Sequence, residues 1–368
     1  MERNVSRGFL QWPAATPFFL AALGVTLMSF PACGRKSDPA AAEHLGPTAP
    51  LPRSFPSLTK LILGDPIVQK GLELTGRIQA LPFAATFQNM SGGPQTIEAF
   101  RAGALDASSV GDTPPIHAAF TGLDVKIVAV QFRDRPSFQL AVAPGAHVAS
   151  IADLRGKKVA YSPGQAQGSL VLRVLKKAGL TRHDVTLVEI ESPAFKDALA
   201  SRQVDVAPLS GPILVRFLRE QARAGATAIA HGVRDSISFF YARTTVLDDP
   251  DRAAALREYI EERTRAQVWS VDHPDAWIDA YYVKDQGLTP EQGRDLVETV
   301  GRPQYPADWT ETIAETQETI ELLADATGQA SFDAHKIFDR RYETVAADAA
   351  ADARVTNVTT RVQQGTPQ

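Results

Sequence analysis

The sequence predicts an α/β protein built of two doubly wound lobes that are joined by a two-crossover hinge. The first observation is a repeat: residues 98–116 read EAFRAGALDASSVGDTPPI, and residues 197–214 read DALASRQVDVAPLSGPIL. The second is the alternation of short apolar runs with amphipathic stretches over residues 58–230, which is typical of parallel βαβ units. The third is the strand-like run 236–242, which follows the second copy and is expected to return the chain to the first lobe.

The first lobe is expected over residues 57–143 and 237–346. Its strands are short apolar runs that end at Gly, Pro or Asp, the residues that favour turns. Proline opens several of its helices, because the N–H groups of the first helical turn have no intrahelical partner. The expected strands are 58–63, 83–88, 104–109, 125–131 and 137–142, and the expected helices are 94–102, 114–121, 249–271, 274–285, 290–300 and 308–326, with one more that ends at Gly76.

The second lobe is expected over residues 144–236 and shows the same alternation. When the two copies of the repeat are aligned, Asp106 falls on Asp205. Each copy is then a helix, a strand and a polar loop that opens a further helix. The expected elements are a helical turn at 151–154, strands at 157–161, 185–190, 204–209 and 226–230, and helices at 169–178, 194–202 and 212–224, the first of which has Gly179 as its natural C-cap.

The N-terminal residues are expected to be a signal peptide over 1–33. Arg3 and Arg7 give a positive start, and the apolar run 18–30 is too short for a membrane-spanning helix. Cys33, the only cysteine of the chain, follows this run where bacterial lipoproteins carry their lipidated cysteine. The alternative is an incidental cysteine in a segment without function. The protein is therefore expected to be exported, periplasmic or at the cell surface, and lipid-anchored.

Two further segments are expected to lie outside the lobes. Residues 34–56 contain five prolines and few large apolar residues, which predicts an extended linker. Residues 347–368 are poor in core residues and predict a flexible tail.

The composition excludes several classes of function. The chain has 368 residues and a formal net charge of −4, so nothing suggests nucleic-acid binding. The seven histidines are scattered and no HExxH or CxxC occurs, so neither a metal site nor another cofactor is expected. Five aromatic residues of the C-terminal helices have the spacing of packing residues rather than of a cofactor site: Trp269, Trp277, Tyr281, Tyr282 and Trp309.

Four loops are expected to converge on a cleft between the lobes: 64–66, 111–113, 163–169 and 210–211. Ligands of α/β sheets bind outside the carboxyl ends of the strands, beside helix N-termini, where free N–H groups favour an anion. Hydroxyl and amide side chains in these loops would let neutral donors hold an oxyanion. The expected ligand-binding residues are Asp65, Ser91, Gly92, Gly111, Asp112, Thr113, Gln165, Gln167, Gly168, Ser169, Ser210 and Gly211.

The two acidic residues of this set have two interpretations. Asp65 and Asp112 each precede a helix and are expected to act as N-caps. The alternative is that one faces the cleft, where it would suit a ligand with a cationic part, such as an amino-sulfonate. No catalytic residues are expected, because no serine has a GxSxG context and the loop GQAQGS lacks the GK[ST] of a nucleotide site.

At these residues the chain resembles a family. The run SGGPQTIEAFRAGALDASSVGDTPPI, followed by IADLRGKKVAYSPGQAQGS, is similar to the aliphatic-sulfonate and nitrate/taurine substrate-binding proteins of bacterial ABC transporters. The resemblance covers residues 58–245. It implies a type II periplasmic-binding-protein fold, capture of a small anionic solute, and delivery to a membrane permease with its ATPase. Many relatives have a Trp-rich segment where this chain reads VDVAPLSGP from Val204, so the pocket near Ser210 is expected to be less aromatic.

Other functions stay open beside this interpretation. Within the resemblance, the ligand could be taurine, nitrate or a thiamine-precursor pyrimidine. A desulfinase-like enzyme of the same fold would use a cysteine in the pocket, whereas Cys33 lies in the signal region. A sensor that signals through closure of its lobes is the third class.

Overall fold

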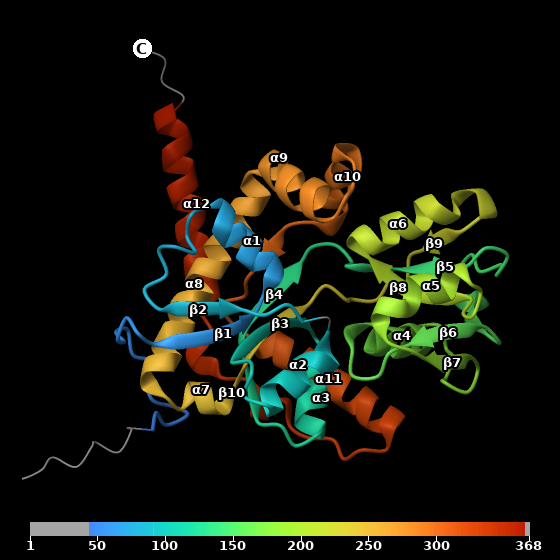
Figure 1. Ribbon diagram of the computed structural model, residues 1–368. Coiled ribbons are helices and arrows are strands. Elements are labelled where there is room, and N and C mark those ends of the chain that lie inside the picture. Colours follow the sequence, from blue (N-terminus) through green and yellow to red (C-terminus); the bar gives the residue numbers. More distant parts are fainter. Residues whose placement is uncertain (1–43, 91, 365–368) are drawn as a thin grey trace, which may run out of the picture. The chain divides into compact units, whose positions relative to one another are not determined.

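The computed structural model describes residues 44–90 and 92–364, with side chains as far as residue 354. Two mixed β-sheets, each covered by helices, organise the described chain (Figure 1). We call the body around the six-stranded sheet lobe one and the body around the five-stranded sheet lobe two. Cys33 and Ser91, and the expected signal peptide over residues 1–33, lie outside the described residues.

The sheet of lobe one has the strand order β11-β4-β10-β3-β1-β2. Strands β2, β1 and β3 are parallel, whereas β10 pairs antiparallel with both β3 and β4. Such a sheet needs helical crossovers between its parallel strands. The strands are β1 (Lys60–Gly64), β2 (Ala84–Phe87), β3 (Ala107–Gly111), β4 (Val125–Arg133), β10 (Ser238–Arg243) and β11 (Pro303–Gln304).

The sheet of lobe two has the order β7-β6-β8-β5-β9, which matches that of lobe one from β2 to β4. Here too the three strands on one side are parallel, and the fourth, β5, is antiparallel to β8. The strands are β5 (Phe138–Val142), β6 (Lys158–Tyr161), β7 (Thr186–Glu189), β8 (Val206–Ser210) and β9 (Thr227–Ile229). Residues 134–137 and 230–237 are therefore the two crossovers between the lobes.

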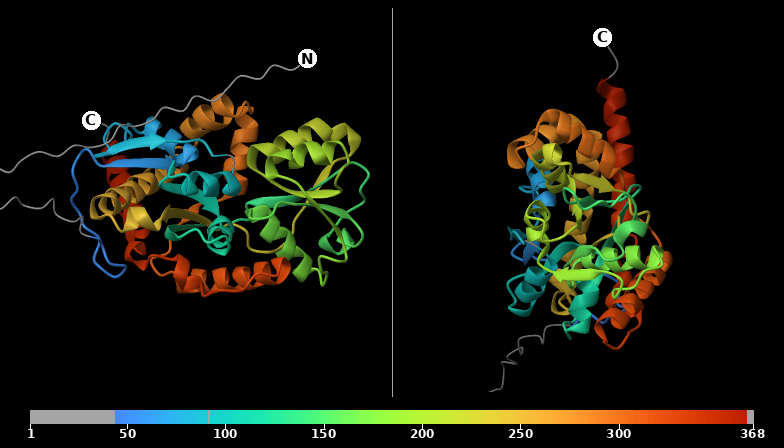
Figure 2. Two further views of the ribbon diagram at one scale, coloured as in Figure 1. Left: turned by 60° about the horizontal axis from the view of Figure 1, so that its bottom comes forward. Right: turned by 90° about the vertical axis from the view of Figure 1, so that its right-hand side faces the viewer.

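Helices cover both sheets. In lobe one, α1 (Pro66–Leu74), α2 (Gly93–Arg101) and α3 (Pro114–Phe120) each begin with proline in the first turn. In lobe two the main helices are α4 (Ala166–Lys177), α5 (Phe195–Ala200) and α6 (Gly211–Gln221). The C-terminal helices are α7 (Thr244–Leu247), α8 (Pro250–Asp272), α9 (Pro274–Trp277), the π-helix Ile278–Asp285, α10 (Pro290–Val300), α11 (Thr310–Thr327) and α12 (Val345–Gln364), with α11 running past both lobes (Figure 2).

The repeated stretch has the same structure in both lobes. In lobe one the carboxylate of Asp106 accepts the Ile62 N–H at 2.9 Å, and the Asp106 N–H donates to the Ile62 carbonyl at 2.8 Å. In lobe two Asp205 makes the same two contacts with Lys158, both at 2.8 Å. Each aspartate, just before β3 or β8, is thus hydrogen-bonded to the neighbouring parallel strand, β1 or β6. The predicted repeat is confirmed.

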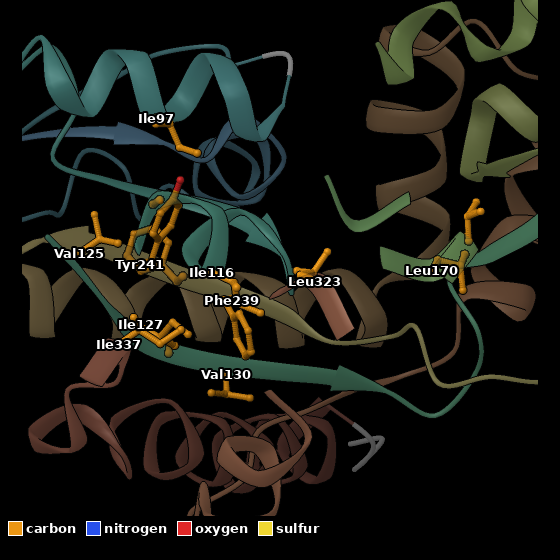
Figure 3. Close-up of a cluster of buried hydrophobic side chains, with 14 of the residues drawn as sticks. Ile97, Ile116, Val125, Ile127, Val130, Leu170, Phe239, Tyr241, Leu323 and Ile337 are labelled. Atoms are coloured by element: carbon orange, nitrogen blue, oxygen red, sulfur yellow. The ribbon is translucent and has the colours of Figure 1, made fainter. Parts of the chain in front are cut away.

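The main core lies between the sheet of lobe one and its helices. Phe239 and Tyr241 of β10 are fully buried among aliphatic side chains of β4 and α2 (Figure 3). The Tyr241 ring meets Phe100 edge-on at 4.8 Å between ring centroids. Burying side chains of this size contributes about 2–3 kcal/mol each. Because β10 follows lobe two in the sequence, this core forms only when the chain has returned to lobe one.

Three expectations about the borders of the lobes are wrong. Phe138–Val142, expected in lobe one, pairs with β8 and β9 of lobe two. Residues 44–56, expected as a free linker, are bonded to lobe one, since Leu45 N–H donates to the Asp248 carbonyl at 2.8 Å and Phe55 packs on Phe83. Residues 347–364, expected in a flexible tail, belong to α12, whose alanines lie close against α8.

Candidate ligand-binding site

A cavity of about 370 Å³ lies between the two lobes. Lobe one contributes the carboxyl ends of β1 and β3 and the starts of α1 and α2. Lobe two contributes the start of α4, and both crossovers complete the wall. The lining residues are Gly64, Asp65, Pro66, Ile67, Met90, Gly92, Gly93, Thr96, Ser109, Val110, Gly111, Pro114, Ser137, Phe138, Gln165, Ala166, Gln167, Asp235, Ile237 and Ser238.

Five of the expected ligand-binding residues line this cavity: Asp65, Gly92, Gly111, Gln165 and Gln167. The rule that parallel strands end at the ligand side of the sheet explains this result, because β1, β3 and β6 all point toward the interlobe space. That these residues bind a ligand remains a prediction.

Three other expected residues join the lobes beside the cavity instead of lining it. The Thr113 hydroxyl donates to Ser169 Oγ at 2.7 Å across the lobe boundary, and both side chains are buried. It also lies 2.9 Å from Asp112 Oδ1. Asp112 in turn accepts from Arg173 of α4 at 2.6 Å. These polar groups are thus engaged with one another.

The remaining expected residues support lobe two. A Cβ atom at Gly168 would lie 2.3 Å from the Ser162 carbonyl, so this glycine allows α4 to pack on its own loop. Ser210 pairs with Phe138 in the sheet, and Gly211 has open space around it. None of the three lines the cavity. Sequence alone identified the ends of the strands but not which side of each loop faces the cleft.

The starts of α2 and α4 both lie at the cavity, and neither has a side-chain cap from its N-cap residue. Gly92 precedes α2 and Gln165 precedes α4. The Gln165 side chain reaches across to α2, where its Oε1 accepts the Gly93 N–H at 3.3 Å. Because Gln165 accepts the first N–H of α2 and Pro94 at the next position has none, it is the start of α4 that presents first-turn N–H groups, whose partial positive charge favours an anionic ligand.

The expected N-cap role of both aspartates is wrong. Asp65 makes no cap bond to α1, and Asp112 precedes Thr113, which is the N-cap residue of α3. Instead, Asp65 Oδ2 accepts from Tyr259 Oη at 3.1 Å and from Arg263 Nε at 3.0 Å. All three side chains are buried.

Arg263 is a functional candidate that the sequence analysis missed. It lies in α8, donates to Ser109 Oγ at 2.8 Å, and stacks over the Phe240 ring at 4.6 Å from the centroid. Burial alone would lower the pKa of Arg263, but the nearby Asp65, Tyr259 and Tyr305 and the hydrogen bond to Asp65 together outweigh it, so the net pKa is raised and the guanidinium stays charged. Nothing local in the sequence of α8 marks this arginine, because its partners come from β1 and β3.

Close backbone approach between the lobes depends on small residues. A Cβ atom at Gly111 would lie 2.6 Å from the Ala166 Cβ, and one at Gly93 would lie 3.2 Å from the Gly164 carbonyl oxygen of lobe two. At the crossovers, Asp235 accepts the N–H groups of Ser137 and Phe138 at 2.8 and 2.7 Å. The lobes are therefore held together at one wall of the cavity and at the hinge.

A second cavity, of about 400 Å³, lies between α4 and α11. Three of its basic side chains have partners: Arg173 bonds Asp112, Arg234 bonds Glu315, and Lys177 donates to the Gly232 carbonyl. It contains none of the helix starts described above. The cavity between the lobes is therefore the candidate ligand site.

Comparison with known proteins agrees with this architecture. A family model described as NMT1/THI5 like matches residues 86–275, which is just over half of the chain. The chain belongs to the NMT1/THI5-like family. The match runs from the end of β2 through lobe two into α9, so it includes most of the loops that line the cavity.

Two curated relatives of this NMT1/THI5-like chain are named as aliphatic sulfonates-binding proteins. The protein of Escherichia coli (strain K12) is 33% identical over 120 residues, which is 33% of this chain and 38% of the relative. That of Bacillus subtilis (strain 168) is 25% identical over 193 residues, 51% of this chain and 56% of the relative. The matches thus span about two fifths to just over half of these relatives.

A solved structure shares the fold. The periplasmic aliphatic sulphonate binding protein SsuA from Escherichia coli superposes with a TM-score of 0.64 at 20% identity, covering 76% of this chain and 91% of that one. The predicted periplasmic-binding-protein fold is confirmed. Over the described residues, no helix combines the length and the apolar character that a membrane crossing requires. The same residues hold no group of three or more metal-ligating side chains.

Proposed function

We propose that this chain is the solute-binding component of an ABC importer and captures a small organic oxyanion, an aliphatic sulfonate, between its lobes. The observation that carries the proposal is the interlobe cavity, where the start of α4, which has no side-chain cap, meets walls from both lobes. The names of the two curated relatives support the ligand class.

The chemistry of the cavity suits such a ligand. A sulfonate has three acceptor oxygens, to which the Ala166 and Gln167 N–H groups at the start of α4 and the side-chain amide of Gln167 can donate. Apolar side chains on the same cavity, among them Met90, Val110 and Phe138, can cover an alkyl chain. Nitrate and taurine belong to the same proposal as further candidate ligands.

The cellular setting follows from the sequence. We infer export by the signal peptide over residues 1–33, lipidation at Cys33, and delivery of the ligand to a permease and its ATPase. Residues 44–56 lie on lobe one, so the anchor would tether that lobe. The proposal includes no reaction, since the single cysteine available to a desulfinase-like mechanism is Cys33.

Calorimetric titration of the purified protein tests the proposal, with butane-1-sulfonate, taurine, nitrate and sulfate as ligands. A sulfonate is expected to bind and to raise the melting temperature, because a ligand that binds only the folded state stabilises it by mass action. A Gln167→Ala variant should weaken binding by about ten-fold, the value of one charge-assisted hydrogen bond. Gly46→Ala, far from the cavity and with open space around it, is the control.

Binding of a neutral heterocycle, with no binding of any anion, would contradict the proposal. Release of sulfite from an aryl sulfinate would point to the enzymatic alternative instead.

A further inference from the structure

The start of α2 lies at the interlobe cavity, but a side chain of lobe two already occupies it. Gln165 is buried, and its Oε1 accepts the Gly93 N–H, the first donor of α2, at 3.3 Å. The next residue, Pro94, has no N–H to donate. The Gln165 amide therefore takes the place that an acceptor group of a ligand could otherwise have at this helix start.

Glycines on both sides of this contact allow the Gln165 side chain to lie against the backbone of α2. A Cβ atom at Gly92 would lie 2.5 Å from Gln165 Nε2, so the amide lies directly over this residue. Gly164, the residue before Gln165, has a φ of +71°, and a Cβ atom there would lie 2.9 Å from the His117 ring of lobe one. The loop that carries Gln165 thus packs closely on lobe one, which fixes where its side chain lies.

The cavity has a single region that favours negative charge. The start of α4 presents the Ala166 and Gln167 N–H groups and has no side-chain cap. Among the described residues, the lining contains no lysine, arginine or histidine, and its charged residues are Asp65 and Asp235. Burial of an ionised group without a counter-charge or hydrogen bonds is strongly unfavourable. One anionic group can therefore be held at α4, whereas a second one finds neither a cation nor the first N–H of α2.

We propose that Gln165 is a specificity-determining residue that restricts the ligand to a single anionic group. The inference rests on the proposed function, because it places the sulfonate of the ligand at the start of α4. Gln165 acts by occupying the first N–H of α2, which a second oxyanion would need. Removal of the side chain leaves that N–H without its acceptor and adds the space of the amide to the cavity. The wild type therefore prefers monosulfonates to disulfonates, and a variant without the side chain loses this preference.

The test compares two ligands of nearly the same shape, 3,3-dimethylbutane-1-sulfonate and ethane-1,2-disulfonate, in which a second sulfonate replaces the tert-butyl group. Calorimetric titration of the wild-type protein at pH 7 should give at least about ten-fold tighter binding of the monosulfonate, because the second charge is buried without donors. In Gln165→Ala this preference should fall by about ten-fold, the value of one hydrogen bond to a charged group. The ratio of the two affinities is the readout, since loss of a bond between the lobes weakens closure on both ligands alike.

Two further variants sharpen the comparison. Gln165→Gly is a second route to the same measurement, because glycine is tolerated at the N-cap position that Gln165 holds in α4. It should lose the preference as Gln165→Ala does. Gln203→Ala removes the same side chain at an exposed position of lobe two and is the matched control. It should keep the preference of the wild type.

Equal or tighter binding of ethane-1,2-disulfonate to the wild type would overturn the inference and leave the proposed function standing. A preference that both Gln165 variants retain would overturn the role of Gln165. Binding of butane-1-sulfonate without binding of either test ligand would also overturn the inference, because size rather than charge would then select the ligand. No binding of butane-1-sulfonate to the wild type would overturn the proposed function and the inference with it.

Discussion

Asp106 and Asp205 occupy equivalent places in the two lobes but stand in different surroundings. Each accepts one backbone N–H from the neighbouring parallel strand. Asp106 also accepts from Arg243 at 2.6 Å and from Arg252 at 2.5 Å. Burial alone would raise the pKa of Asp106, but the hydrogen bonds from Arg252, Ile62 and Arg243 outweigh it and hold the pKa below 3.8.

Asp106→Asn is expected to destabilise the protein by about 3 kcal/mol, because two arginines lose a buried counter-charge while the backbone contact survives. Asp205→Asn should cost about 1 kcal/mol or less, since it changes only the backbone contact. Urea unfolding at pH 7 measures both free energies of unfolding, and equal losses in the two variants would refute the distinction.

The pH dependence of the Asp106 effect has a definite sign. A carboxylate whose pKa is lower in the folded state adds stability above its unfolded pKa and loses it as the pH falls toward the folded pKa. The stability gap between the wild type and Asp106→Asn should therefore be complete at neutral pH and should shrink below a pH of about 3.8. Repeating the urea titrations from pH 7 to pH 3 would reveal this trend, and a constant gap would exclude it.

Thr113 and Ser169 form a buried hydrogen bond between the lobes. Thr113→Ala and Ser169→Ala should each cost about 1–2 kcal/mol, and a double-mutant cycle should show a coupling of about 1 kcal/mol. Additive losses, measured by chemical unfolding, would mean that the two hydroxyls act independently.

At the scale of single residues, the sequence predicted which residues lie at the cavity better than it predicted which side chains they bond to. Asp65, Gly111 and Gln167 were expected at the cavity because they follow strand ends, and they line it. The partners of Asp65 could not be predicted, because Tyr259 and Arg263 lie almost 200 positions away on one turn of α8. The same applies to the bond between Asp112 and Arg173, which joins different lobes.

At the scale of elements, α12 shows how an alanine-rich segment can belong to the core. Ala349 and Ala350 are buried, and the helix packs on α8. Small side chains let two helices approach closely, whereas a search for large apolar residues overlooks them. The strand β5 was predicted in the wrong lobe for a different reason. Its apolar sequence correctly predicts a strand, but does not specify which of the two sheets that strand joins.

Ala350→Leu should lower the free energy of unfolding by about 1–3 kcal/mol, because the added carbons have no space between α12 and α8. Ala351→Leu, at an exposed position of the same turn, is the matched control and should have little effect. Thermal unfolding of both variants checks this. Equal melting temperatures would mean that α12 does not contribute to the folded core.

The contact between β3 and α4 depends on Gly111. Gly111→Ala places a methyl group against Ala166, so α4 must move away from lobe one, and both ligand affinity and stability should fall, the latter by about 1–3 kcal/mol. Gly46→Ala adds the same atom in open space and should change neither quantity. Titration and chemical unfolding of the two variants test the contact, and unchanged affinity in Gly111→Ala would show that it is not needed for closure.

At the scale of the whole molecule, lobe two is one continuous insertion into lobe one. All of its strands lie between Phe138 and Ile229, and its two ends are adjacent, since His231 Nε2 lies 3.0 Å from the Phe138 carbonyl. The two-lobed plan could be predicted because the repeat and the return strand are local patterns. The place of β5 in the sheet of lobe two could not be predicted, because it depends on pairing over long sequence distances.

A fragment of residues 134–237 is therefore expected to fold without lobe one. It contains every strand of its sheet in sequence order and has neighbouring ends. Circular dichroism with urea should show a cooperative transition. A fragment without one would mean that α11, which packs on α4, is required for this lobe to fold.

The position of β10 between β3 and β4 also has a consequence during synthesis. The chain emerges with its N-terminus first, whether from the ribosome or on export, so β3 and β4 emerge long before the strand that separates them. Lobe two, whose last strand ends at Ile229, can complete its sheet while the sheet of lobe one still exposes two apolar strand edges. Such edges can pair with other chains until residues 238–243 fill the gap. A chaperone that protects the chain in this interval would therefore bind β3 and β4, in the part of the chain that emerged first, rather than the later residues.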